Sequence, residues 1–228
     1  MANSHFNQSV REVEKFLHQI SKLKQKGVKN INNDGVTNET KTAFRKESYA
    51  KAYHIALQNL DYDFLLEDES FFQLEFEETD KIPQIRYAFF QNPTDYTSYE
   101  DFLQGQLGDL YEEYTDEYRE DYSQFLTELD ENTPSTIIRF DVHKKGYKPL
   151  VHSFAHIHIG YKSDVRIPCN KILTPLLFAF FVIKHVYPYV WESFITNNPK
   201  VLENEKRKCD DVSTAFWSKE EQTDLFLT

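Results

Sequence analysis

The chain has 228 residues, of which 40% are hydrophobic and 15% aromatic, so it is long and apolar enough for one sizeable core. Its formal net charge of −11 argues against sequence-independent binding to long DNA, which needs a broad basic surface. A local basic site is compatible with this charge, because residues 139–166 are locally basic while much of the acid lies within 109–131. The charge is therefore compatible with a nucleic-acid or phosphate substrate, and also with a basic protein partner for the acidic surface.

The sequence carries no sign of a membrane span, a leader or a cysteine-based site. No run of about 18 uncharged apolar residues is present, and the most apolar stretch, 172–186, already contains Lys184 and His185. The N-terminus lacks the basic-then-apolar pattern of a signal peptide. Cys169 and Cys209 have neither zinc-ribbon nor disulfide-framework spacing. We therefore expect a cytoplasmic protein with no membrane partner.

The first quarter of the chain predicts helices. Apolar residues at helical spacing predict one helix over 8–26, ended by Gly27, and a second over 39–60. The polar, turn-rich segment 28–39 between them predicts a loop. We expect the two helices to form a hairpin against the main body.

From Tyr62 onward the apolar period becomes that of strands. Residues 71–76 and 84–90 alternate on either side of a turn, which predicts a hairpin, and Pro93 closes its second strand. A short helix over 98–106 and a long helix over 109–130 follow. Aromatic residues three or four positions apart line one face of the long helix, and acidic residues fill the other. The aromatic face is a packing surface or a partner surface.

The stretch 135–191 holds most of the residues able to do chemistry at neutral pH. Its first strand-like run has one face with Ile138, Phe140 and Val142 and another with Arg139, Asp141 and His143. The second run has one face with Ala155, Ile157 and Ile159 and another with Phe154, His156 and His158. Residues 165–167 form a third run. Thr174 and Pro175 then predict the N-cap and first turn of a nearly all-apolar, central helix that stops at Tyr187.

These elements predict an α+β protein with a central antiparallel sheet made from 62–90 and 136–167. The apolar helix 174–187 would pack on the sheet, with the N-terminal helices at its flank. We divide the chain into an N-terminal helical segment (1–60), an α+β core domain (61–200) and a charged C-terminal tail (201–228). The tail would pack on the core through aromatic and apolar residues, namely Phe216, Trp217, Leu225 and Phe226.

Pairing of the two strand-like runs would gather polar side chains over one sheet face. A divalent metal ion is one interpretation, held by His156, His158 and Asp141 with His143 or His152. Metal-independent RNA cleavage is another, with one histidine as base, the other as acid, and a cation beside the phosphate. That cation would be Arg139, Arg166 or Lys162. In a third interpretation, the histidines and an Arg139–Asp141 ion pair are purely structural. Our candidate catalytic residues are His156, His158, Arg139, Asp141 and Arg166, with no organic cofactor.

Several established catalytic patterns do not fit. The chain has no Walker loop, no Gly-x-Gly-x-x-Gly, no His-Glu-x-x-His and no Gly-x-Ser-x-Gly. Gly160 occupies the position at which histidine-triad hydrolases would have a third histidine. The glutamate that cupins carry shortly after His-x-His is also missing.

The run RFDVH…HSFAHIHIG…RIPCN…TPLLFAFFVIKHVYP resembles an uncharacterised bacterial family of unknown function. In that family an Arg-Phe/Tyr-Asp strand precedes a His-x-His strand, Arg-Ile-Pro, and a Thr/Ser-Pro helix that ends in Tyr-Pro. The likeness covers about 137–188, and the matching positions are Arg139, Asp141, His156, His158 and Arg166.

The same order of motifs is similar to that of small bacterial toxins of toxin–antitoxin pairs that act on RNA. Those toxins are shorter and have denser histidine clusters than this chain. The resemblance implies a ribonuclease-like effector in stress response or phage defence, kept silent by an antitoxin or another protein partner. The alternative function is a non-catalytic interaction module that binds a larger partner through its acidic helix.

Overall fold

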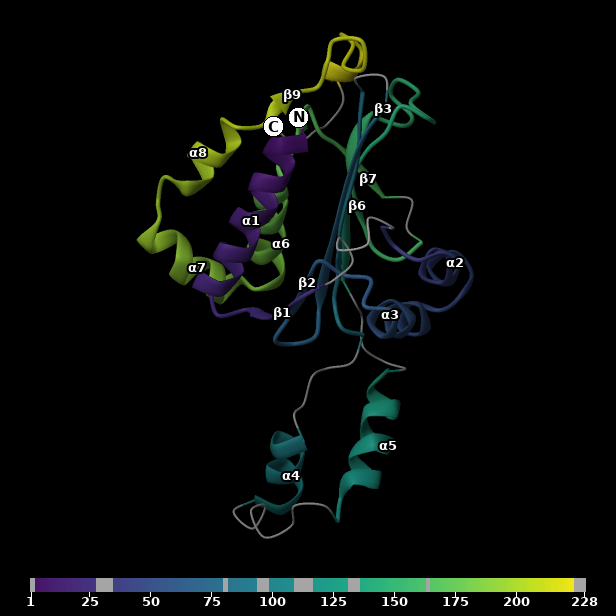
Figure 1. The fold of residues 1–228 in the computed structure, drawn as a ribbon, viewed down its shortest axis with the longest axis vertical. Helices are drawn as coiled ribbons and strands as arrows, with labels where there is room; N and C mark the ends of the chain where they lie inside the picture. Colours follow the sequence, from purple (N-terminus) through teal and green to yellow (C-terminus); the bar gives the residue numbers. More distant parts are fainter. Residues whose placement is uncertain are drawn as a thin grey trace.

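The computed structural model describes residues 3–27, 35–79, 82–93, 99–108, 117–130, 136–162 and 165–223. Within these ranges, seven strands form one antiparallel sheet, and each strand pairs with its neighbours in sequence order. Helices cover both faces of the sheet (Figure 1). The predicted α+β class with a central antiparallel sheet is therefore confirmed.

The main sheet is a meander of consecutive strands. Its strands are β1 (Leu23–Lys26), β2 (Phe64–Leu66), β3 (Phe71–Thr79), β4 (Ile82–Phe90), β5 (Ile137–Val142), β6 (Ala155–Ile159) and β7 (Arg166–Pro168). The pairing of β3 with β4 from Phe71↔Phe90 to Thr79↔Ile82 confirms the predicted hairpin. A separate two-stranded ladder joins β8 (Lys171–Ile172) to β9 (Asp210–Asp211).

The helices fall into three groups (Figure 1). One side of the sheet carries α1 (Asn3–Gln19), α6 (Pro175–Val186), α7 (Pro188–Asn197) and α8 (Val201–Lys206), of which α1 and α6 contact the sheet. The other face carries α2 (Asn38–Lys46) and α3 (Tyr49–Gln58), and α4 (Tyr99–Leu107) and α5 (Arg119–Asp130) lie beyond one end of the sheet. A short 3-10 helix, η2 (Glu221–Thr223), follows near the C-terminus. No helix within the described ranges is long and apolar enough to cross a membrane.

The predicted helix over 8–26 is wrong in its second part. The helix ends at Gln19, Ser21 takes a left-handed φ of 53°, and the chain then forms edge strand β1 against β2. Gly27 follows β1 at a close approach, because a Cβ there would lie 1.7 Å from the carbonyl oxygen of Tyr62. Backbone pairing with the sheet therefore replaces the last helical turns, which periodicity alone does not reveal.

The second predicted helix, 39–60, is interrupted at Glu47 and Ser48. Ser48 has an extended backbone and its hydroxyl accepts a hydrogen bond from the N–H of Lys51, so it caps a new helix. The expected hairpin with α1 is also wrong, because α1 packs on α6 and α2 packs on α3 across the sheet from it (Figure 1). The apolar face of α1 packs in the main core, whereas those of α2 and α3 pack in a smaller core on the opposite face of the sheet.

The main core lies between the sheet and the helices α1 and α6. It contains five of the six residues expected to point inward from β5 and β6, namely Ile138, Phe140, Val142, Ala155 and Ile157. The sixth, Ile159 at the end of β6, is exposed. Thr174 caps α6 by accepting a hydrogen bond from the N–H of Leu177, Pro175 occupies the first turn, and most of the helix is buried, as predicted. Burial of each large apolar side chain stabilises the fold by roughly 1.5–3 kcal/mol.

A smaller core occupies part of the opposite face. Phe44 of α2 lies 4.6 Å from Phe90 of β4 between ring centroids, and Tyr53 of α3 lies 5.3 Å from Phe71 of β3. These contacts cover only the end of this face that carries Phe71, Phe90 and Ile137. The rest of the face is polar and forms the candidate site.

The C-terminal segment contacts the body through Phe216. The ring of Phe216 stacks on that of Phe154, with centroids 4.3 Å apart and planes at 8°. Phe154 is consequently buried in the main core, so its expected place beside the histidines is wrong. It precedes the first ladder residue of β6, and strand alternation does not apply to it. Leu225 and Phe226 lie outside the described residues.

The helices α4 and α5 pack on each other. Phe102 of α4 lies 5.4 Å from Tyr122 and 5.1 Å from Phe125 of α5 between ring centroids. The aromatic face of α5 is therefore a packing surface at these two positions. The earlier part of the predicted long helix, 109–116, lies outside the described residues.

Candidate functional site

The register of three neighbouring strands, β5, β6 and β7, brings the predicted site residues together. Arg139 lies opposite His158, and Asp141 lies opposite His156 in the β5–β6 pair. The strand β7 pairs with the other edge of β6, and there Arg166 also lies opposite His158. Because directly paired residues point to the same face, all five candidate residues share one face of the sheet.

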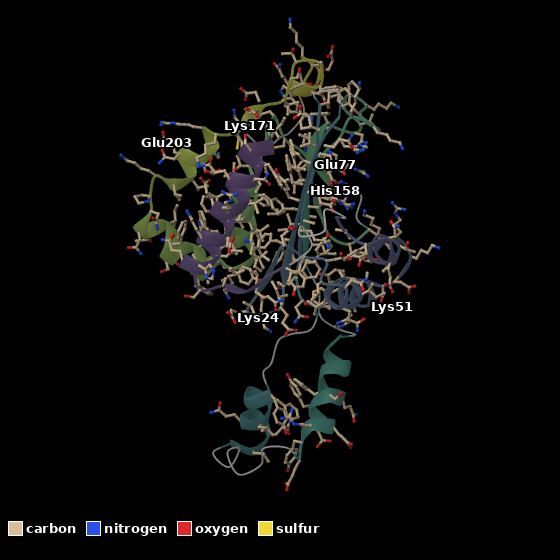
Figure 2. All side chains as sticks on the ribbon, in the orientation of Figure 1. Lys24, Lys51, Glu77, His158, Lys171 and Glu203 are labelled. Atoms are coloured by element: carbon tan, nitrogen blue, oxygen red, sulfur yellow. The ribbon has the colours of Figure 1, made fainter. Side chains whose placement is uncertain are left out.

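A cavity of about 410 Å³ opens over this polar face. It is lined by Glu75, Glu77, Gln84, Ile85, Arg86, Arg139, Asp141, Val142, His143, His152, His156, His158 and Arg166. Figure 2 labels two of these side chains, Glu77 and His158, beside the sheet. The cavity is of a size that small-molecule sites commonly have.

Asp141 is the centre of the polar contacts. Its Oδ2 atom accepts a hydrogen bond from Nε of Arg139 at 2.7 Å and lies 3.3 Å from Nε2 of His158. Nε of Arg86 lies 4.0 Å from the other oxygen, Oδ1. Burial by itself raises the pKa of Asp141, but the His158 hydrogen bond and the two guanidinium charges outweigh it and lower the pKa to about 2. The carboxylate is therefore negatively charged at neutral pH.

His156 is held in one tautomer. The residue is 1% exposed, and its Nδ1 atom lies 2.7 Å from the carbonyl oxygen of Ser153. A carbonyl can only accept, so Nδ1 carries the hydrogen and Nε2 carries the lone pair in the neutral ring. Burial, and secondarily the charge of His158, lower the pKa of His156 to about 4 despite the opposing effect of Asp141. A neutral imidazole with a directed lone pair is the form that binds metal ions.

The two histidines point their Nε2 atoms at each other. These atoms are 3.0 Å apart, and together with an oxygen of Asp141 they lie within 4.8 Å of one another. Two nitrogens bound to a tetrahedral ion at roughly 2.0–2.1 Å would be about 3.3 Å apart. Two histidines and one carboxylate are a recurrent ligand set for zinc and iron, and the Ser153 carbonyl is the kind of outer partner that orients a ligating histidine.

The same geometry does not favour metal-independent acid–base cleavage. A base and an acid must approach a phosphodiester from different sides, whereas Nε2 of His156 and Nε2 of His158 face each other. A pKa of about 4 also makes His156 a poor proton-transfer group at neutral pH. The sequence was compatible with both metal binding and metal-independent RNA cleavage, and metal binding fits these distances better.

The additional histidines and lysine considered from the sequence take other partners. Nδ1 of His143 faces the carbonyl of Lys145, and Nδ1 of His152 faces that of Gly146 at 2.8 Å. Both histidines line the cavity, but within the described ranges only Asp141, His156 and His158 form a compact ligand cluster. Nζ of Lys162 donates to the carbonyl of Glu47 at 2.9 Å, and Lys162 does not line the cavity.

Three charged residues of the cavity were not predicted from the sequence, namely Arg86, Glu75 and Glu77. Arg86 lies opposite Asp141 in the β4–β5 pair, and Glu75 lies opposite Arg86 in the β3–β4 pair. Burial, followed by the charge of Arg139, lowers the pKa of Arg86, although Asp141 and Glu75 oppose this. The sequence did contain a signal for Arg86, because it is the only charged residue in the predicted strand QIRYAFF. Alternation places it on the face opposite to Ile85 and Tyr87, and a charged side chain indicates that this face is polar.

Fold and site together define an α+β protein with a meander sheet and a histidine–aspartate cluster on its polar face. The chain belongs to the family described as "Uncharacterized conserved protein (DUF2290)", whose model matches residues 13–226. This match confirms the resemblance to a family of unknown function. No curated protein and no solved structure matches the chain.

Proposed function

We propose that this protein hydrolyses phosphodiester bonds in RNA with a divalent metal ion held by Asp141, His156 and His158. The observation that carries the proposal is the convergence of three ligand atoms within 4.8 Å in a cavity that is also lined by arginines. An ion held by these three residues would supply Lewis acidity and lower the pKa of a bound water molecule. The physiological role we propose is that of a bacterial effector, either a toxin or a phage-defence component, kept silent by a partner.

The arginines support an anionic substrate. Arg86, Arg139 and Arg166 line the cavity, and a guanidinium group matches the geometry of phosphate oxygens. The net charge of −11 would repel phosphate from most of the remaining surface, so this group of arginines would localise binding. Arg139 would also orient Asp141 through their 2.7 Å hydrogen bond.

RNA as the substrate rests on the sequence resemblance to ribonuclease-like toxins. The chemistry of the site itself fits a phosphodiester of either nucleic acid. A direct comparison of single-stranded RNA with DNA of the same sequence therefore belongs in the test.

The proposal is tested with purified protein, labelled single-stranded RNA, and added Mn²⁺ or Zn²⁺. We expect metal-dependent cleavage that EDTA abolishes and that His158→Ala reduces to background, with a melting temperature close to that of the wild type. His158→Gln provides a second variant if alanine impairs folding. His54→Ala, at an exposed position of α3, is the matched control and should cleave normally. Wild-type protein that cleaves nothing with either metal, or a His158→Ala variant that retains full activity, would refute the proposal.

The alternative, an interaction module, is supported by the position of α4 and α5. These helices lie beyond the end of the sheet, and Glu117, Glu120 and Asp121 are exposed at or near the start of α5 (Figure 1). A basic surface on a larger partner would complement them. Charge reversal at these three positions should abolish recovery of the partner in a pull-down from native cells, and unchanged recovery would count against this surface.

A further inference from the structure

A second cavity, of about 290 Å³, lies on the face of the sheet opposite to that of the histidines. Ile157, which separates His156 from His158 along the strand, belongs to its wall. The remaining apolar wall includes Leu173, Leu177 and Phe180, and α8 contributes Leu202. The cavity is thus lined by the sheet, α6 and α8, and it shares no lining residue with the first cavity.

The cavity has a positively charged edge. Lys171 of β8, Lys184 of α6 and Lys206 of α8 line it together with His185, although these elements are separate in the sequence. Figure 2 labels Lys171 and His158 on opposite sides of the sheet. No aspartate or glutamate is among the described residues that line the cavity, in a chain with 37 acidic and 26 basic residues.

Lys171 lies on a strand, and the other two lysines lie on helices. Nζ of Lys171 lies 2.5 Å from a carboxylate oxygen of Asp211, a residue that is largely exposed. Lys184 and Lys206 are both exposed at the edge of the cavity, on two different helices. An anionic group placed between these two helices would therefore meet positive charge from both sides.

We propose that this cavity binds a fatty-acid-like carboxylate. The alkyl chain would lie against Leu177, Phe180 and Ile157, and the carboxylate would lie at Lys184 and Lys206. Apolar walls account for the hydrocarbon part of the ligand, and the lysines account for its charge. The proposal is independent of the proposed hydrolysis, because it involves the opposite face of the sheet.

Isothermal titration calorimetry of the full chain tests the proposal, with octanoate and decanoate below their micelle concentrations. We expect saturable binding at one site, strengthened roughly fourfold by each added methylene until the cavity is filled. Decyltrimethylammonium has a similar tail and the opposite charge, so it should bind at least about tenfold more weakly than decanoate.

Two kinds of variant locate the site. The double variant Lys184→Glu/Lys206→Glu should weaken decanoate binding about tenfold, whereas Lys200→Glu, an exposed lysine outside the cavity, should leave it unchanged. Leu202→Trp, at a partly buried position of α8, should fill the cavity and block binding. Melting temperatures confirm that each variant is folded. Absence of saturable decanoate binding, equal binding of the cation, or decanoate affinity unaffected in both kinds of variant would overturn the proposal.

Discussion

Arg86 on β4 lies directly opposite Asp141 on β5, and Nε of the arginine is 4.0 Å from Oδ1 of the aspartate. The other oxygen of Asp141 accepts the hydrogen bond from Arg139. One carboxylate therefore separates two guanidinium groups whose charges repel each other. This arrangement makes Asp141 both a ligand candidate and the counter-charge that keeps the arginines together.

Asp141→Asn removes that counter-charge and a negatively charged ligand. We expect the affinity for Zn²⁺ to fall by about tenfold or more, because both the ligand and the charge that attracts the ion are weakened. Titration calorimetry of the metal-free protein measures this loss. The control is Asp210→Asn, an exposed carboxylate of β9 outside the cluster, which should bind Zn²⁺ normally. Equal affinities in the two variants would exclude Asp141 as a ligand.

Arg86→Ala separates substrate binding from metal binding. Arg86 is not in the ligand cluster, so the metal content should match that of the wild type. Cleavage should fall by roughly 10²-fold, because a positive charge aimed at the phosphate is lost. Arg11→Ala, at an exposed position of α1, is the matched control. Kinetic constants and elemental analysis of the same preparations check both parts, and a metal-free Arg86→Ala protein would contradict this role.

Phe178→Ala tests the contribution of the central helix to stability. Phe178 is fully buried, and its ring lies 5.7 Å from that of Tyr87 and 6.3 Å from that of Phe72 between centroids. The variant should lose about 3–5 kcal/mol of unfolding free energy, because the truncation leaves a cavity in the core. Tyr189→Ala, at a residue that is 86% exposed, should change it by less than about 0.5 kcal/mol. Urea denaturation of both variants measures the difference.

Thr174→Val tests the start of the same helix. The Thr174 hydroxyl accepts from the N–H of Leu177 at 3.1 Å and donates to the buried carboxylate of Glu205 at 2.6 Å. Valine has the same shape but cannot bond to the N–H of Leu177 or to the carboxylate of Glu205. We therefore expect the free energy of unfolding to fall by about 2–4 kcal/mol. Ser48→Ala removes a solvent-exposed cap and should cost only about 1 kcal/mol. Equal losses in chemical denaturation would show that the contact with Glu205 contributes nothing.

The rate at which the two cysteines are alkylated at different pH values tests whether their thiols are buried. Burial raises the pKa of Cys209 from 9.0 to about 11 and also raises that of Cys169. A thiol with a raised pKa stabilises the folded state fully below pH 9, and this contribution is lost as the pH rises toward 11. Because only the thiolate reacts, alkylation by iodoacetamide should be slow at pH 8 in the folded protein and should accelerate toward pH 11. Protein unfolded in guanidinium should react rapidly at pH 8, and equally rapid labelling of the folded chain would contradict the burial of both thiols.

Local patterns explain which elements were predictable. The hairpin of β3 and β4 follows from alternation in 71–76 and 84–90, and α6 follows from its Thr174–Pro175 start and apolar composition. These signals depend on residues that are neighbours in the chain. The edge strand β1 gave no such signal, because its sequence LKQK becomes a strand only through hydrogen bonds to β2.

The sequence by itself determined that Arg139 and Asp141 share one face of a strand, and that His156 and His158 share one face of another. Alternation of side chains is a property of any single extended segment, so no partner is needed to predict it. Only the tertiary structure decided that Asp141 lies between Arg86 and His156, and that the two Nε2 atoms meet at 3.0 Å. The register between strands sets these neighbours, and register depends on the packing of the whole sheet against its helices.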